Sequence, residues 1–167
     1  MPKSSHVGRS VLALTIWCTA SLVAAQQGDD KGTPPASAGG ANWFLKGGDF
    51  KGQHYSPLDQ VSTANVDRLG LAWAADLPIP DGVATTPIVI DGVVYLSGAY
   101  SIVLAVDATS GDILWSYDPE VRDAISERAI LSWLARANRG VAVWDGKVFL
   151  TTADCRLIAL DAAKGTR

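Results

Sequence analysis

Residues 91–111 occur a second time at residues 145–165, at a constant offset of 54 positions and without a gap. Nine of the 21 aligned positions are identical, namely Asp91/Asp145, Gly92/Gly146, Val94/Val148, Leu96/Leu150, Ala99/Ala153, Ala105/Ala159, Asp107/Asp161, Ala108/Ala162 and Gly111/Gly165. Such a repeat indicates structural units that bury their apolar faces against one another, because one unit alone has too little surface to form a core. The repeat therefore restricts the chain to stacked modules.

Each copy has the pattern of short antiparallel strands. Asp91-Gly92 stands between two apolar runs, which is the signal for a two-residue hairpin turn, since both central residues need a positive φ. The run 102–106 is almost entirely apolar, and we expect it between two packed layers. β-branched, aliphatic and aromatic residues predict strands at 87–90, 93–96, 102–106 and 112–115. Four short antiparallel strands in each unit predict a blade of a β-propeller.

Composition excludes several other classes of protein. The 167 residues include 14 basic and 17 acidic side chains, and the formal net charge of −3 argues against a general nucleic-acid binder. Two cysteines exclude a disulfide-dense scaffold and a zinc site with four cysteine ligands. Six tryptophans and 16 glycines beside one methionine favour all-β repeats joined by tight turns.

The first 25 residues have the pattern of a secretory signal peptide. Lys3 and Arg9 precede an apolar run over residues 11–25, which is shorter and more interrupted than the roughly 20 apolar residues that a transmembrane helix needs. Small residues at Val23 and Ala25 permit cleavage. This prediction implies export without a stable membrane span after cleavage, whereas the alternative is an N-terminal membrane anchor.

Residues 26–41 are rich in Gly, Pro, Ser and Asp, with little to bury, and we expect a flexible linker there. Folded structure is then expected over residues 42–167. Cleavage after the signal would leave Cys155 as the single cysteine, which cannot form an internal disulfide.

The segment 105–115 resembles the tryptophan-docking motif of quinoprotein propellers, in which the tryptophan of one blade packs beside a glycine of the adjacent blade. The second copy of the motif reaches Arg167 before its tryptophan, so we expect a blade cut within the motif. Further segments resemble the mature N-terminus of the quinoprotein alcohol and methanol dehydrogenases: Asn42-Trp43, Tyr55-Ser56-Pro57-Leu58, Ala72-Trp73, Thr86-Pro87-Ile88 and Asn138-Arg139-Gly140. The resemblance covers residues 42–167.

The resemblance implies an all-β fold, a partial eight-bladed β-propeller with about two blades of tryptophan-docking repeats and one short helical insertion. Proteins of this family hold pyrroloquinoline quinone (PQQ) and Ca²⁺ on the propeller axis. They oxidise primary alcohols to aldehydes in the periplasm, with an Asp as general base, and pass electrons to an acceptor of the cytochrome c type. The resemblance places that Asp and the Ca²⁺ ligands outside this chain, so it assigns no catalytic residue and no metal ligand here.

Arg139 is the one cofactor-binding residue that the resemblance assigns. It matches the family arginine that pairs with the quinone, and a guanidinium presents a fork of donors to carboxylates and carbonyl oxygens. The alternative is a surface arginine that follows a helix. Ala84 stands where relatives usually have a glutamate that bonds the quinone.

Trp133-Leu134 stand where many relatives have two adjacent cysteines. Trp133 either covers one face of the quinone or packs in the core as part of an amphipathic helical stretch over 125–134. Asp118 and Pro119 are expected to open that stretch as N-cap and first turn. The remaining polar candidates are weaker: His54 lies in a polar loop, and the repeat aspartates such as Asp107 are expected to stabilise turns.

The first functional hypothesis is therefore the N-terminal portion of a periplasmic, PQQ- and calcium-dependent alcohol dehydrogenase, inactive as this fragment. The alternative is a non-enzymatic propeller segment that acts as a binding scaffold in the cell envelope, which Ala84 and the absent cysteine pair favour. A third hypothesis is a fragment whose copies assemble to complete a ring.

Overall fold

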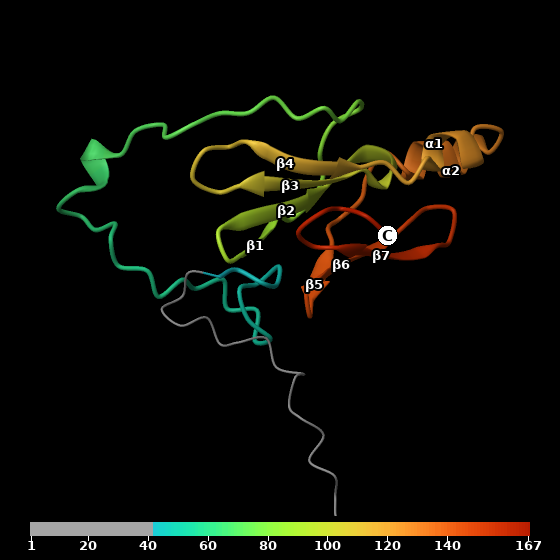
Figure 1. Ribbon diagram of the computed structural model, residues 1–167. Coiled ribbons are helices and arrows are strands. Elements are labelled where there is room, and N and C mark those ends of the chain that lie inside the picture. The colour runs from blue at the N-terminus through green and yellow to red at the C-terminus, as the bar shows by residue number, and fades with distance from the viewer. Residues whose placement is uncertain (1–41) are drawn as a thin grey trace, which may run out of the picture. The chain divides into compact units, whose positions relative to one another are not determined.

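The computed structural model of the protein describes residues 42–167. The predicted signal peptide over residues 1–25 and the predicted linker over residues 26–41 lie outside the described residues. The described part contains two antiparallel sheets, and two short α-helices separate them in the chain (Figure 1). None of the helices within it is long and apolar enough to cross a membrane.

The first sheet has the four strands that the sequence predicts for one blade. They are β1 (Ile88–Ile90), β2 (Val93–Ser97), β3 (Val103–Asp107) and β4 (Ile113–Tyr117), and they pair antiparallel in the order β1-β2-β3-β4. A 3-10 turn over Ala99–Ser101 joins β2 to β3. The prediction of a four-stranded propeller blade is confirmed.

The second sheet repeats the first at the offset of the sequence repeat. Its strands are β5 (Ala142–Trp144), β6 (Lys147–Thr151) and β7 (Leu157–Asp161), in the order β5-β6-β7. Val93 pairs with Asp107 in the first sheet, and Lys147 pairs with Asp161 in the second, so the register is also repeated. The same residue pattern has therefore produced the same hairpins twice.

The Asp-Gly pairs form the turns that the sequence predicts. Asp91 and Gly92 have φ values of 51° and 79°, and Asp145 and Gly146 have values of 46° and 69°. Two consecutive residues with positive φ give a turn whose twist matches that of the flanking strands. The local sequence thus fixes both hairpins.

Strand β3 is buried on both faces, as its apolar sequence predicts. Leu104 and Val106 belong to one core cluster, together with Tyr100, Val121 and Ile125. The alternate residues of β3 belong to a second cluster that joins the two sheets; its buried members are Ile88, Tyr95, Val103, Ala105, Trp115, Val148, Leu150, Ile158 and Leu160. Successive residues of a strand point to opposite faces of the sheet, so β3 contributes side chains to both core clusters.

Two indole rings connect successive modules. The Trp115 indole N–H donates to the Ala162 carbonyl at 2.9 Å, and a Cβ added at Gly165 would lie 2.6 Å from the Trp115 ring. Trp73 contacts the first sheet in the same manner, with its N–H donating to the Ala108 carbonyl at 3.0 Å. Only glycine leaves room for a ring at this distance. The predicted packing of a tryptophan beside a glycine of the next blade is therefore present.

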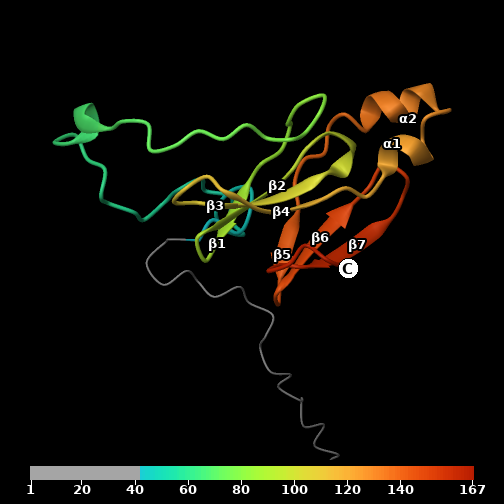
Figure 2. The ribbon, with the colours of Figure 1, turned by 45° about the horizontal axis from the view of Figure 1, so that its top comes forward.

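The helical insertion differs in detail from the prediction. It consists of α1 (Val121–Ala124) and α2 (Ala129–Leu134) (Figure 2), and Glu120, with φ 59°, stands at the N-cap position of α1. The Asp118 carboxylate accepts the Glu120 N–H at 2.8 Å and stabilises the turn before the helix, so its assignment as N-cap is wrong.

Only part of the predicted apolar face of the insertion is buried. Ile125 is 1% exposed and packs in the first core, but Trp133 is 66% exposed. The expectation that Trp133 packs in the core is wrong, because Leu131 of α2 packs against the first core and Trp133, two positions further along the helix, lies on another face and is exposed.

The residues before the first sheet contribute one edge contact. Trp43 and Val89 exchange backbone hydrogen bonds of 2.8 and 2.9 Å, and the Asn42 side chain bonds the Asp91 backbone N–H at 2.9 Å. These bonds place residues 44–46 beside the end of β1.

Candidate functional site

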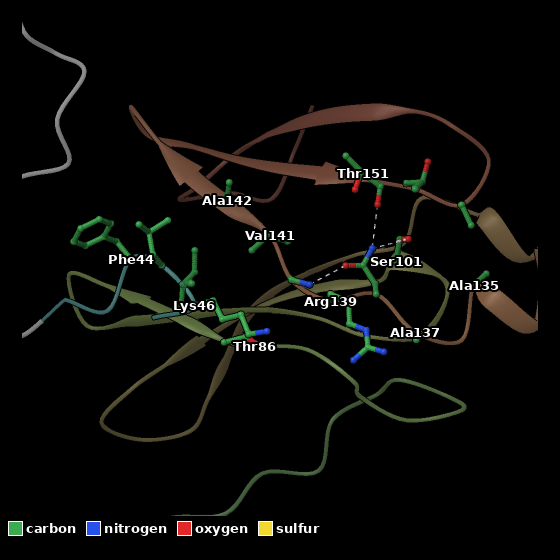
Figure 3. Close-up of a pocket in the computed structure, with 16 residues that line it drawn as sticks. Phe44, Lys46, Thr86, Ser101, Ala135, Ala137, Arg139, Val141, Ala142 and Thr151 are labelled. Atoms are coloured by element: carbon green, nitrogen blue, oxygen red, sulfur yellow. Dashed lines mark hydrogen bonds between the residues drawn. The ribbon is translucent and has the colours of Figure 1, made fainter. Parts of the chain in front are cut away.

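A cavity of about 520 Å³ lies where the ends of the two sheets meet (Figure 3). Its walls come from residues 44–46, from Thr86 and Ile88, from Ser101, from Ala135 and residues 137–142, and from residues 151–153. These segments are far apart in the sequence, and the pairing of Trp43 with Val89 brings the first of them to the site. The volume is in the range of sites for small organic ligands.

The charged side chains that line the cavity are all positive. Arg139 and Lys46 are its charged residues, both are exposed, and no carboxylate is among the lining side chains of the described residues. A guanidinium and an ammonium without an adjacent carboxylate attract an anion, and the guanidinium can bond a carboxylate with two donors. The arrangement can therefore bind an anionic ligand with oxygen acceptors.

The backbone at Arg139 is fixed by a close approach to the entry of β1. The Thr86 N–H donates to the Arg139 carbonyl at 3.2 Å. Gly140 has φ 140°, and a Cβ there would lie 3.2 Å from the Thr86 carbonyl oxygen. A side chain at this position would be strained and crowded, so glycine is required. The structure thus brings together the Thr-Pro and Asn-Arg-Gly motifs that carried the family resemblance.

The sequence placed Asn138 in the Asn-Arg-Gly motif but assigned no role to it, or to Ser97, Ser101 or Thr151. The Asn138 amide bonds Ser97, Ser101 and the Thr151 carbonyl, and dashed lines in Figure 3 mark the bonds to Ser101 and Thr151. Ser97 and Thr151 stand at equivalent positions of the repeat, but Ser97 uses its hydroxyl and Thr151 its backbone carbonyl. Nothing in the local pattern connects them with Asn138, since the contact depends on how the two sheets pack.

The other predicted positions lie away from the cavity wall. Ala84 is exposed, and neither Ala84 nor Trp133 is among the lining residues. His54 is exposed in a loop with φ 54°. Whether Trp133 covers a ligand stays a prediction, as does the pairing of Arg139 with a quinone.

The repeat aspartates stabilise turns, as predicted. The Asp107 carboxylate accepts hydrogen bonds from the Thr109 side chain and from the backbone N–H groups of Thr109 and Ser110, the latter two at 2.8 and 3.0 Å. These bonds hold the pKa of Asp107 below its ordinary value, because they favour the ionised carboxylate. Asp161 accepts the equivalent backbone bonds from Ala163 and Lys164.

No group of three or more His, Cys, Asp and Glu side chains within residues 42–167 is arranged to hold a metal ion. The charged side chains of the cavity wall, Arg139 and Lys46, are suited to bind and orient an anion.

Comparison with protein families gives a match over residues 43–167. The matching family model is described as PQQ, the β-propeller domain of glucose, ethanol and alcohol dehydrogenases. It therefore includes both sheets, the helical insertion and every segment of the cavity wall.

The curated relatives that the chain resembles are named as alcohol dehydrogenases. The chain is 48% identical over 124 residues to the dehydrogenase subunit of the alcohol dehydrogenase (quinone) of Gluconacetobacter polyoxogenes, covering 74% of this chain and 16% of that protein. It is 46% identical over 130 residues to the 1-butanol dehydrogenase (cytochrome c) of Thauera butanivorans, covering 78% of this chain and 18% of that protein. The chain thus spans less than a fifth of the length of these relatives.

Solved structures agree. The quinohemoprotein alcohol dehydrogenase ADHIIG of Pseudomonas putida HK5 superposes with a TM-score of 0.67 at 46% identity, over 76% of this chain and 18% of that chain. A europium-containing methanol dehydrogenase superposes with a TM-score of 0.61 at 32% identity, over 75% of this chain and 22% of that chain.

Proposed function

Because the chain belongs to the family of the glucose/ethanol/alcohol dehydrogenase β-propeller domain, we propose that it is the N-terminal part of a PQQ- and Ca²⁺-dependent dehydrogenase of primary alcohols. The observation that carries the proposal is the cavity wall, where Arg139 and Lys46 face a ligand site without an adjacent carboxylate. In this proposal the chain supplies about two blades of the propeller and one wall of the cofactor site.

The residues present fit the cofactor. PQQ carries carboxylates and carbonyl oxygens, which match the guanidinium of Arg139 and the ammonium of Lys46. When bound, it would accept the electrons that leave the alcohol as the aldehyde forms. Arg139 would fix the orientation of the ring system by pairing with an oxygen at its edge, and the wall residues would exclude water from that side.

The proposed partners follow from the relatives. The protein of Thauera butanivorans is named a 1-butanol dehydrogenase (cytochrome c), and that of Pseudomonas putida a quinohemoprotein alcohol dehydrogenase. We therefore propose a small primary alcohol as substrate and a cytochrome c-type electron acceptor. Periplasmic location is proposed on the basis of the predicted signal peptide over residues 1–25. The general-base Asp and the Ca²⁺ ligands are proposed to lie outside residues 1–167.

To test the proposal, any cofactor is first removed from the natural protein. The protein is then titrated with PQQ, and binding is followed by absorbance. Arg139→Ala should weaken PQQ binding about tenfold or more, since a hydrogen bond to a charged group contributes roughly 1.5–3 kcal/mol. Arg136→Ala is the matched control, because it removes the same charge from an exposed residue that is not on the cavity wall.

Equal PQQ affinity in the two variants would contradict the role of Arg139. Failure of the unmodified protein to bind PQQ would favour the second candidate, a non-enzymatic scaffold of the cell envelope. One observation favours that candidate: Ala84, the position of the expected glutamate, is exposed and away from the cavity wall.

A further inference from the structure

We propose that Asn138 is a positioning residue that holds Arg139 on the cavity wall by connecting the two sheets. The part of the inference that concerns quinone affinity rests on the proposed function. The part that concerns the placement of Arg139 rests on the hydrogen bonds of the described residues alone.

The Asn138 side chain makes hydrogen bonds with both of its polar atoms. Its Nδ2 donates to the Ser101 hydroxyl and to the Thr151 carbonyl, each at 3.0 Å. Its Oδ1 accepts from the Ser97 hydroxyl at 2.7 Å and from the Gly140 N–H at 3.1 Å. Both N–H donors and both lone pairs of the amide are therefore engaged.

The partners of Asn138 are fixed points of the fold. Ser97 ends β2 and is 0% exposed, and Ser101 ends the turn between β2 and β3 and is 2% exposed. Thr151 is the last residue of β6 in the second sheet. The one amide therefore bridges the ends of β2 and β6.

The bond to Gly140 places Arg139 at the centre of a turn. A side-chain oxygen that accepts the N–H two residues later closes an Asx turn, which restrains the residue between them. On the other side, the Thr86 N–H donates to the Arg139 carbonyl at 3.2 Å. The backbone of Arg139 is thus held on one side by the Asx turn and on the other by Thr86, which precedes β1.

Amide hydrogen exchange in the natural protein tests the placement. In Asn138→Ala we expect the Thr86 amide to exchange at least about tenfold faster, because exchange requires local opening of its bond to Arg139. Asn138 does not contact the Thr86 amide, so the change would report movement of Arg139 itself. Asn65→Ala is the matched control, since Asn65 also uses both amide atoms, on Ser62 and Gln60, within its own loop. Unchanged exchange at Thr86 in Asn138→Ala would overturn the inference.

A double-mutant cycle on PQQ affinity distinguishes positioning from a merely structural role. Asn138→Ala should weaken PQQ binding about tenfold, and its combination with Arg139→Ala should weaken it little more than Arg139→Ala alone, because the two act as one unit. Multiplicative losses would overturn positioning through Arg139.

The inference can still be tested if Asn138→Ala does not fold or if the unmodified protein binds no PQQ. If Asn138→Ala does not fold, exchange at Thr86 is measured in Asn138→Asp instead; this variant keeps the size of the side chain but loses the donors to Ser101 and Thr151, and faster exchange is again expected. If the unmodified protein binds no PQQ, the proposed function fails, and exchange at Thr86 still decides the placement.

Discussion

Among single residues, the turn aspartates have the clearest electrostatic effect. The Thr109 side chain is the largest contributor to the lowered pKa of Asp107, and the backbone N–H groups of Thr109 and Ser110 add to it. Because the folded carboxyl binds its proton less tightly than the unfolded one, these bonds stabilise the fold above the ordinary aspartate pKa of 3.8. That stabilisation is lost as the pH falls through the lowered value.

Replacing Thr109 should therefore change the dependence of stability on pH. In Thr109→Val we expect a lower urea midpoint at about pH 7 and a smaller further fall between about pH 4 and pH 2 than in the unmodified protein. Thr109→Ser keeps the hydroxyl donor and should behave like the unmodified protein. Parallel pH profiles for Thr109→Val and the unmodified protein would contradict the assignment of the hydroxyl bond.

Only some of the residues of the site could be predicted from the sequence. Arg139 could be predicted because its motif lies in one short segment. Lys46 could not, since only the backbone pairing of Trp43 with Val89 brings residues 44–46 to the cavity. Asn138 was missed for the same reason, because its partners belong to two different sheets.

At the scale of elements, the contact between modules depends on the indole of Trp115. Its ring packs on Gly165, its N–H bonds the Ala162 carbonyl, and the Tyr95 hydroxyl donates to that same carbonyl at 3.3 Å. The ring centroids of Tyr95 and Trp115 are 6.1 Å apart. The two aromatic side chains therefore connect the first sheet to one peptide group of the second.

Trp115→Phe should lower the stability of the protein by about 1–3 kcal/mol, because it removes the indole hydrogen bond and leaves space beside Gly165. Trp133→Phe is the matched control, since Trp133 is 66% exposed and its replacement should change stability by less than about 0.5 kcal/mol. Urea unfolding followed by circular dichroism measures both variants. Equal stability of the two would show that the indole contact does not hold the modules together.

The strands were predictable and the helices were only partly so. Two-residue Asp-Gly turns and a constant offset determine hairpins locally, and both sheets follow them. An apolar stretch such as 125–134 predicts a helix with a buried face, but burial depends on what that face meets. Ile125 meets the first sheet, whereas α2 exposes Ile130, Trp133 and Leu134.

At the scale of the whole molecule, much apolar surface is exposed in the described residues. Leu157 at the start of β7 is 73% exposed, and residues 50–71 carry seven exposed large apolar side chains: Phe50, Tyr55, Leu58, Val61, Val66, Leu69 and Leu71. Exposed apolar surface of this extent usually meets another part of a protein. The chain corresponds to 16–18% of the length of its dehydrogenase relatives.

We therefore expect residues 1–167, produced alone, not to oxidise alcohols. This expectation rests on the proposed function, in which residues 1–167 supply one wall of the cofactor site and the general-base Asp and the Ca²⁺ ligands lie outside them. Purified chain with PQQ, Ca²⁺, ethanol and an artificial dye should leave the dye oxidised, whereas the natural protein should reduce it. Dye reduction by the isolated chain above a blank without protein would refute this expectation.

Each indole contact joins a tryptophan to a glycine that lies later in the chain. Trp115 lies 50 residues before Gly165, on which it packs, and Trp73 lies 38 residues before Gly111. In both contacts the indole comes from the segment that precedes its glycine in the chain. The surface that donates the indole and the surface that receives it differ, so each module is turned from its neighbour by a rotation that the contact fixes. In a β-propeller such rotations add up to a closed ring, and the number of blades depends on the size of the rotation.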